Sequence, residues 1–273
     1  MNLAELRAIV SAGPAGDRPA APHGQPTVHL VGAGPGAADL LTLRAARLLA
    51  SADIVLHDAL VSADILALAP QARLVPVGKR CGRLSSAQSF INKQLVDAAR
   101  RYRTVVRLKG GDPMLFGRAQ EEIDSLTAAG VAVEVVPGIS AAFGAAGSLQ
   151  RSLSQRGVSR SVTFITPAVG TGQAPHDWAK PAVAADTVVL YMASRQAGRI
   201  AEGLLAAASR PAALVENATL PNERVVATTI GSLGEAAERL GSGPALILVG
   251  DIYAGLAQRG ELQQAAMPLA GAA

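Results

Sequence analysis

Short apolar runs alternate with segments of helical spacing from residue 27 to about residue 256. Residues 28–31 form the first run, a glycine-rich turn follows, and a helical pattern extends over 40–51. Continuous apolar strands between helices are typical of sheets that helices cover on both faces. The sequence therefore predicts an α/β protein of two lobes joined near residues 137–147. We expect a mostly parallel first sheet and a mixed second one, because several connections in the second half are short enough for hairpins.

The expected elements divide the chain into two domains with loose ends. The strands are expected at 28–31, 54–56, 73–77, 105–108, 133–136, 162–165, 187–191, 213–215, 224–229 and 245–249. The helices are expected at 40–51, 62–69, 87–101, 117–129, 195–208 and 232–240. These elements give an N-terminal α/β domain at 27–137 and a C-terminal α/β domain at 138–256. Residues 1–26, rich in proline, are expected to form a flexible leader, and residues 257–273 a frayed tail.

The composition narrows the class of protein. Of the 273 residues, 49% are hydrophobic, which is enough for a packed core and excludes disorder as the main state. Only 3% are aromatic, which argues against a stacking platform for single-stranded nucleic acid. The formal net charge of +4 invites a nucleic-acid partner, but no nucleic-acid-binding motif accompanies it. We therefore expect a small-molecule ligand and no nucleic-acid partner.

Three further counts limit the chemistry and the location. The single cysteine, Cys81, permits no disulfide within the chain, which fits a reducing cytoplasm. No uncharged apolar run reaches the length of a transmembrane helix, so we expect no membrane partner. The four histidines are scattered at positions 23, 29, 57 and 176, so no metal site is predicted.

The densest group of positive charges consists of Arg100, Arg101, Arg103, Arg107 and Lys109. Its simplest interpretation is a solvated helix end followed by a strand. Arginines gathered around a pocket for a polyanionic small molecule would explain the charge equally well, because the guanidinium fork matches carboxylates and phosphates. Both interpretations stay open at the level of the sequence.

A glycine-rich turn, Gly32-Ala-Gly34-Pro35-Gly36-Ala, follows the first expected strand. Its spacing matches the dinucleotide-binding fingerprint, with Asp53 about 20 residues further on, which would suggest an oxidoreductase. However, Pro35 lacks the backbone N–H that a pyrophosphate would need, and the helix begins late. The sequence therefore favours a tight turn that lets the backbone approach some other ligand.

A second glycine-rich turn, Gly110-Gly111-Asp112-Pro, follows the fourth expected strand. Open α/β sheets bind ligands at the carboxyl ends of their strands, and two glycines permit close approach. An ordinary connection between a strand and a helix is the alternative. Arg118 and Glu121 lie three apart at the start of the next helix and can point together into a cleft. A salt bridge between them on the surface is the alternative there.

A third turn, residues 136–142 (VPGISAA), opens a helix of small residues, against which a ligand can lie or which can link the lobes. At this point the motifs resemble those of the tetrapyrrole methylase family. The matching stretches are VHLVGAGPGAADLLTLRAARLL, ADIVLHDALV, VGKRCG, INKQLV, VVRLKGGDPMLFGR with the following EE, VEVVPGISAA, DTVVLYM and ALVENAT. They follow the family's order over roughly residues 27–250, nearly the whole expected fold.

The resemblance implies two α/β domains with S-adenosylmethionine bound in the cleft between them, in a cytoplasmic homodimer. The implied reaction transfers two methyl groups to pyrrole carbons of uroporphyrinogen III, through precorrin-1 to precorrin-2, for sirohaem, cobalamin or haem d1. Such a substrate carries eight carboxylates, which an arginine-rich cleft would suit. No metal is implied.

The resemblance also assigns residues by position. The implied cofactor contacts are Pro35, Gly110, Gly111, Asp112, Leu115, Ser140, Ala141, Met192 and Ala218. Asp58 and Lys79 match a proton acceptor and a proton donor, and Arg118 is a candidate to hold a catalytic water. Arg118, Glu121 and Arg156 match positions that contact the substrate.

The chain departs from the family mainly on the substrate side. Gln155 stands where a histidine is usual, Thr166-Pro167-Ala168 replaces Thr-Gly-His, and His57 replaces a common tyrosine; Leu84 also stands where a histidine is common. Two alternatives to the implied activity therefore stay open. One is another precorrin methylase with a shifted substrate, and the other is a protein that binds S-adenosylmethionine or a tetrapyrrole without turnover.

Overall fold

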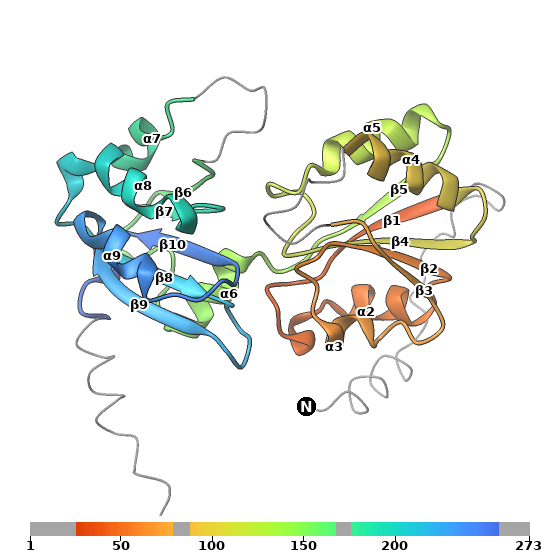
Figure 1. Cartoon of the computed structure of the whole chain (residues 1–273), viewed down its shortest axis with the longest axis horizontal. Coiled ribbons are helices and arrows are strands. Elements are labelled where there is room, and N and C mark those ends of the chain that lie inside the picture. Colours follow the sequence, from red (N-terminus) through yellow and green to blue (C-terminus); the bar gives the residue numbers. More distant parts are fainter. Residues whose placement is uncertain (1–25, 79–87, 168–175, 257–273) are drawn as a thin grey trace, which may run out of the picture. The chain divides into compact units, whose positions relative to one another are not determined.

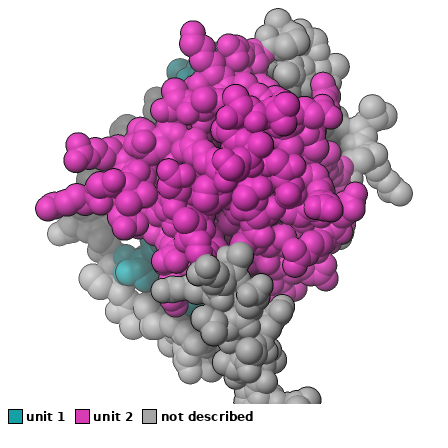
Figure 2. All heavy atoms as spheres, turned by 90° about the vertical axis from the view of Figure 1, so that its left-hand side faces the viewer, with its two compact units in different colours: residues 1–141 teal, residues 142–273 magenta. Residues whose placement is uncertain are grey.

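The computed structural model describes residues 26–78, 88–167 and 176–256. Cys81, Leu84, Lys79, nearly all of the expected leader and the expected tail lie outside these residues. The chain divides into two compact units after Ala141 (Figure 1). On the face shown in Figure 2, the atoms of the second unit form one continuous packed mass. Each unit is an α/β structure with its own sheet, as the sequence predicts.

The first unit has a five-stranded sheet in the order β3-β2-β4-β1-β5, and every neighbouring pair is parallel. Its strands are β1 (Thr27–Gly32), β2 (Ile54–His57), β3 (Arg73–Pro76), β4 (Thr104–Lys109) and β5 (Ala132–Val136). The expectation of a mostly parallel sheet is confirmed. Because all five strands run the same way, the turns after β1, β4 and β5 meet at one edge of this sheet.

Helices cover both faces of the first sheet (Figure 1). They are η1 (Ala38–Leu40), α2 (Leu43–Ala50), α3 (Ala63–Leu66), α4 (Gln88–Ala99) and α5 (Ala119–Ala128). Successive side chains of a strand point to opposite faces of the sheet, so they enter the two cores alternately. Leu30 of β1 packs with α4 and α5, and its neighbour Val31 packs with α2 and α3.

The second unit has a mixed sheet in the order β6-β7-β10-β8-β9, as expected from its short connections. Its strands are β6 (Val162–Ile165), β7 (Thr187–Leu190), β8 (Pro211–Glu216), β9 (Arg224–Thr229) and β10 (Ala245–Val249). Strand β10 is antiparallel to both β7 and β8, whereas β6 and β7 are parallel. The carboxyl ends of β6, β7 and β8 therefore lie at one edge of this sheet.

The helices of the second unit are short. They are α6 (Ala141–Leu149), α7 (Ala179–Ala184), η2 (Ser194–Gln196), α8 (Ala197–Gly203), η3 (Leu205–Ala207), η4 (Ile230–Ser232), α9 (Leu233–Glu238) and η5 (Asp251–Tyr253). The core under α7, α8 and α9 includes Leu190, Ile200, Leu214 and Leu233.

The expected helices differ from the observed ones in four places, one of which is the helix expected at 62–69, observed only as α3 (Ala63–Leu66). The helix expected at 40–51 begins only at Leu43, because Leu41 and Thr42 are extended and the Thr42 side chain accepts from Ala45 N at 3.2 Å as an N-cap. The helix expected at 195–208 is divided into two 3-10 turns around α8. Helix α7 has no counterpart among the expected elements, and its six residues with an internal proline explain why.

Candidate functional site

The turns after β1 and β4 are joined by their backbones at the edge of the first sheet. Ala33 N donates to Lys109 O at 2.7 Å, and Gly34 and Gly111 exchange two hydrogen bonds at 3.2 and 2.8 Å. Gly34 has φ +73° and Gly111 has φ +67°, the left-handed region that glycine enters without penalty. The two glycine motifs of the sequence thus form one structure, in which the left-handed backbone of Gly34 and Gly111 disfavours any other residue.

The turn after β5 packs against the other two. A Cβ atom on Gly32 would lie 2.5 Å from Gly138 Cα and 2.7 Å from Gly111 O. These are backbone atoms of the turns after β5 and β4, so neither can move aside independently. Glycine at position 32 is therefore required by the close approach of the turns.

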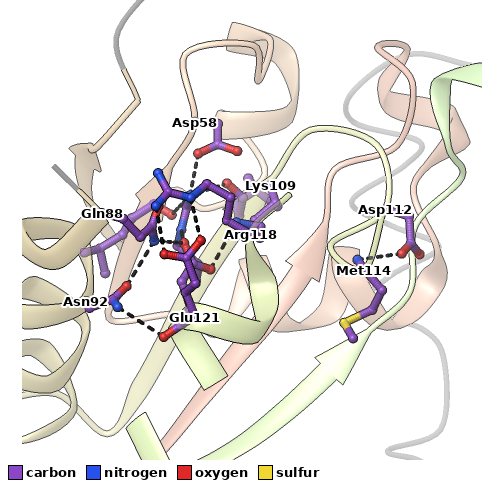
Figure 3. Close-up of polar contacts among 12 residues, drawn as sticks. Asp58, Gln88, Asn92, Lys109, Asp112, Met114, Arg118 and Glu121 are labelled. Atoms are coloured by element: carbon purple, nitrogen blue, oxygen red, sulfur yellow. Dashed lines mark hydrogen bonds and ion pairs between the residues drawn. The ribbon is translucent and has the colours of Figure 1, made fainter. Parts of the chain in front are cut away.

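Asp112 fixes this arrangement with both of its carboxylate oxygens. Its Oδ2 accepts from Gly138 N at 2.9 Å. Its Oδ1 accepts from Met114 N at 2.8 Å (Figure 3). Bonds from backbone N–H groups to a carboxylate are among the stronger hydrogen bonds of proteins. We conclude that the Asp112 side chain holds the second and third turns together.

A group of buried charges lies beside this edge, between the sheet and helices α4 and α5. Residues 105, 107 and 109 of β4 share one face, so Arg107 and Lys109 continue the row begun by Val105. Arg107 and Lys109 are 2% exposed and Glu122 of α5 is 0% exposed. Glu122 Oε1 is 3.0 Å from Arg107 Nε, and its Oε2 is 3.0 Å from Lys109 Nζ.

The simplest sequence interpretation, a solvated helix end followed by a strand, is confirmed: Arg100 and Arg101 are exposed after α4, and strand β4 contains the buried Arg107 and Lys109. Both belong to the central strand of the sheet, where helices cover them. The acidic partner, Glu122, went unrecognised as a site residue because it lies 13 and 15 positions further along the chain. The signal that could have found it is the strand period, which places both cations beneath the following helix.

Asp58 joins this group from the end of β2, two positions after Leu56 and on the same face. Its Oδ1 is 2.5 Å from Arg107 Nη2, and its side chain is 30% exposed (Figure 3). The carboxylate of Asp58 therefore lies where the buried charges reach the surface. Burial and the charge of Arg107 lower the pKa of Lys109, and Glu122 and Asp58 oppose that shift.

Arg118 and Glu121 form a surface ion pair, the alternative left open by the sequence. Arg118 Nε and Nη2 lie 2.7 and 2.8 Å from the two carboxylate oxygens of Glu121, and the side chains are 55% and 52% exposed. The hydrogen bond between them raises the pKa of Arg118 and lowers that of Glu121. Arg118 has φ +56° and Phe116 has φ +52°, so the segment before α5 holds two residues in a strained conformation.

The structure gathers most of the predicted cofactor residues at the edge of the first sheet. The turns after β1, β4 and β5 contain Pro35, Gly110, Gly111, Asp112, Leu115 and Ser140, and Ala141 begins helix α6 directly after the last of them. The predicted proton acceptor Asp58 follows β2 at the same edge. The predicted substrate residue Glu121 accepts a hydrogen bond at its backbone oxygen from Asn92 of α4, at 3.1 Å. Lys79 lies outside the described residues.

The other predicted residues belong to the second unit. Met192 follows β7 and Ala218 follows β8, so both lie at the carboxyl edge of the second sheet. Met192 is exposed with φ +54°, and Ala218 is buried between Asn217 (φ +53°) and Thr219 (φ +70°). Arg156 is exposed in the turn that Gln155 and Ser159 close with two backbone hydrogen bonds of 2.8–2.9 Å.

Across residues 26–78, 88–167 and 176–256, no group of three or more histidine, cysteine, aspartate and glutamate side chains is arranged to hold a metal ion. Within the same part of the chain, helices long and apolar enough to cross a membrane are absent.

A parallel sheet whose strands end in three joined glycine turns defines a ligand-binding α/β protein. The sequence profile of the Tetrapyrrole (Corrin/Porphyrin) Methylases matches residues 27–234. The chain belongs to this family. It is 44% identical over 229 residues to a uroporphyrinogen-III C-methyltransferase of Pseudomonas aeruginosa, and the match covers 82% of this chain and 93% of that protein.

Two further relatives extend the comparison. A siroheme synthase of Chromobacterium violaceum is 44% identical over 254 residues, which are 91% of this chain but 53% of that protein, so the chain spans about half its length. A crystal structure of uroporphyrin-III C-methyltransferase from Thermus thermophilus, in complex with S-adenosyl homocysteine, has a TM-score of 0.73 at 38% identity. That similarity covers 83% of this chain and 98% of the other.

Proposed function

We propose that the chain is an S-adenosylmethionine-dependent methyltransferase that converts uroporphyrinogen III to precorrin-2 through precorrin-1. The observation that carries this proposal is the 44% identity with a uroporphyrinogen-III C-methyltransferase over 93% of that relative's length. The joined glycine turns of the first unit agree with it, since they leave the backbone open to close approach by a ligand.

In this proposal, S-adenosylmethionine contacts the turns of both units. Pro35, Gly110, Gly111, Asp112, Leu115, Ser140 and Ala141 would contact it from the first unit, and Met192 and Ala218 from the second. The residues fit such a ligand, because Gly110 and Gly111 expose backbone groups where other residues would place a side chain. Asp112 would act through the turns it holds, since both of its oxygens already accept backbone bonds. When bound, the cofactor supplies an electrophilic methyl group.

Asp58 accepts the proton that the methylated pyrrole must lose. Its carboxylate is partly exposed and is fixed at one oxygen by Arg107, so it is held in place without being covered. A positioned carboxylate of this kind suits general-base catalysis. Lys79 is the proposed proton donor.

The substrate carboxylates bind to Arg118 and Arg156, with Glu121 beside them. Arg118 presents its guanidinium fork at the surface, where Glu121 occupies it at 2.7 and 2.8 Å. A carboxylate of the substrate would take the place of the Glu121 carboxylate, because both present the same pair of oxygens. Arg118 would thereby orient the macrocycle, or a water, next to Asp58.

The assembly and setting complete the proposal. The working form is a cytoplasmic homodimer, with the cofactor between domains at 27–137 and 138–256. Its product supplies sirohaem, cobalamin or haem d1 synthesis. The siroheme synthases among the relatives favour the first of these routes.

The test is an anaerobic incubation of the chain with uroporphyrinogen III and S-adenosylmethionine that carries a labelled methyl group. We expect a product that contains two labelled methyl groups, detected by mass spectrometry, and a much slower formation of this product in Asp58→Asn. Asp124→Asn, on the exposed side of α5, is the matched control that keeps activity.

Other outcomes would replace the proposal. Methylation of a precorrin but not of uroporphyrinogen III would indicate the shifted substrate that Gln155 and Pro167 make conceivable. Tight binding of S-adenosylmethionine without transfer to any tetrapyrrole would indicate a binding protein. Either result contradicts the proposed reaction.

A further inference from the structure

We infer that Glu122 is a positioning residue for Asp58 and acts through Arg107. This inference rests on the proposed function, in which Asp58 is the general base. Glu122 is fully buried in α5 and does not reach the surface where a substrate would bind. Any effect of Glu122 on the reaction must therefore pass through the groups that it contacts.

Glu122 is held by donors from three directions. Its Oε1 accepts from Arg107 Nε at 3.0 Å and from Gln88 Nε2 at 3.2 Å, and its Oε2 accepts from Lys109 Nζ at 3.0 Å. Gln88 in turn donates to Asn92 Oδ1 at 3.0 Å, which anchors it on α4 (Figure 3). The carboxylate thus has one fixed position between the two helices and the sheet.

Arg107 links the fixed carboxylate of Glu122 to the carboxylate of Asp58. Its guanidinium uses Nε for Glu122, Nη1 for Leu108 O at 3.1 Å, and Nη2 for Asp58 Oδ1 at 2.5 Å. Because a guanidinium is planar, fixing Nε and Nη1 also fixes the direction in which Nη2 points. The Asp58 carboxylate is consequently oriented by a group that cannot rotate without losing buried bonds.

The cost of this arrangement argues against a purely structural role. Taking a carboxylate, an ammonium and a guanidinium out of water is expensive, and apolar side chains of similar size often give equal or better stability. Arg107 and Lys109 occupy positions of a central strand where Val105 is apolar. The charges are concentrated at the end of that strand beside Asp58, where orientation of the carboxylate would benefit from them.

The experiment is a double-mutant cycle on the purified full chain. The variants are Glu122→Gln, Asp58→Asn and the double variant, with Asp124→Asn as the matched carboxylate-to-amide control on α5. We expect Glu122→Gln to lower kcat about 10- to 100-fold, with the affinity for S-adenosylhomocysteine unchanged. In the Asp58→Asn background the same substitution should lower kcat by less than about twofold, because the group it positions is already lost.

Full multiplication of the two losses would overturn the inference, since it would mean that Glu122 acts independently of Asp58. If Glu122→Gln does not fold, Glu122→Met combined with Lys109→Met removes one buried negative and one buried positive charge and leaves Arg107 paired with Asp58. We expect this variant to keep its thermal stability but to lose kcat as Glu122→Gln would, and only when Asp58 is present. Retention of the full kcat would also overturn the inference.

A second measurement separates this inference from the proposed function. The ¹³C chemical shift of the Asp58 carboxyl, assigned with Asp58→Asn, should change in Glu122→Gln and stay constant in Asp124→Asn. The groups that contact Asp58 or its partner are His57 and Arg107 from the sheet, Glu122 from α5, and Lys109 beyond them. An unchanged chemical shift would overturn the inference even if the wild-type chain methylates uroporphyrinogen III. A changed chemical shift in a chain that methylates nothing would keep the positioning and reject only the proposed reaction.

Discussion

The turns at the carboxyl edges of the two sheets differ in their backbone conformation and packing. At the first edge, three turns approach so closely that glycine is required, and Asp112 joins them. At the second edge, Met192, Asn217 and Thr219 adopt left-handed conformations although they are not glycine. The first edge therefore relies on glycine in its turns, with strained residues only further along the chain at Phe116 and Arg118. At the second edge, strained residues closely follow strands β7 and β8.

A carboxylate supports the loops at each edge. Asp112 accepts backbone bonds in the first unit, and buried Glu216 accepts from Gly241 N and Gly243 N at 2.9 and 2.6 Å in the second. The difference lies in what the carboxylate holds. Asp112 joins turns that contain Gly110 and Gly111, where a Cβ would meet its nearest neighbour only at 3.6 and 3.8 Å. Glu216 supports the loop at 241–243, which lies beside the strained segment at 217–219. Substitutions at the two edges should therefore have different effects.

The largest effect is expected for Gly32→Ala in the first edge. The new Cβ would lie 2.5 Å from Gly138 Cα, and backbone atoms on both sides prevent relief. We expect the free energy of unfolding to fall by about 3 kcal/mol or more, measured by chemical denaturation. Gly147→Ala, whose Cβ would meet nothing within 4 Å in α6, is the control and should gain about 0.5–1 kcal/mol. Equal losses in both variants would contradict the close approach.

Arg118→Ala should have the next largest effect, and on turnover rather than on folding. Removal of a charged partner of the substrate is expected to lower kcat/KM for uroporphyrinogen III on the order of 100-fold. The affinity for S-adenosylhomocysteine, measured by calorimetry, should stay nearly intact. Arg100→Ala removes an exposed arginine of the same unit and should leave both quantities unchanged. An equal loss of turnover and cofactor affinity in Arg118→Ala would assign Arg118 to the cofactor.

Thr219→Gly tests the strain at the second edge. A β-branched residue at φ +70° is unfavourable, and glycine removes that cost. We expect the free energy of unfolding to rise by about 1 kcal/mol in thermal or chemical denaturation. Asn217→Gly is the control and should change little, because asparagine tolerates the left-handed region. Destabilisation by Thr219→Gly would show that the segment is not strained.

The smallest effect concerns acid stability of the second unit. Hydrogen bonds from Arg160 N and from Ser161 lower the pKa of Asp186 below its ordinary value of 3.8. A lowered pKa in the folded state stabilises the protein above pH 3.8, and this contribution is lost as the pH falls toward the folded pKa. Asp186→Asn should therefore flatten the dependence of the melting temperature on pH below about 4. An identical pH dependence in both proteins would contradict the shift.

The strands of this fold are predictable because their apolar runs are continuous. Each of the ten described strands coincides with a predicted apolar run, and the runs at 162–165, 224–229 and 245–249 have the observed bounds. The helices were harder, because 3-10 turns and a late N-cap divide patterns that look continuous. Helix α7 has too few residues for a helical period to become visible.

Some residues of the candidate site could likewise be predicted from the sequence, and others could not. The glycine turns are visible in the sequence because glycine marks positions where the backbone needs space. The pairing of Arg107 and Lys109 with Glu122 depends on which helix covers which face of the sheet, and a local pattern contains no such information. The strained residues at 217 and 219 were likewise invisible, since asparagine and threonine carry no obligatory signal for a left-handed conformation.

The proposed function requires S-adenosylmethionine, and not a dinucleotide, to bind at these edges. Isothermal titration of the full chain with S-adenosylhomocysteine, and separately with NAD, tests the identity of this ligand directly. We predict saturable binding of S-adenosylhomocysteine, weakened in Gly111→Ala because φ +67° and the approach of a ligand both disfavour a side chain there, and no binding of NAD. Binding of NAD without binding of S-adenosylhomocysteine would contradict the account.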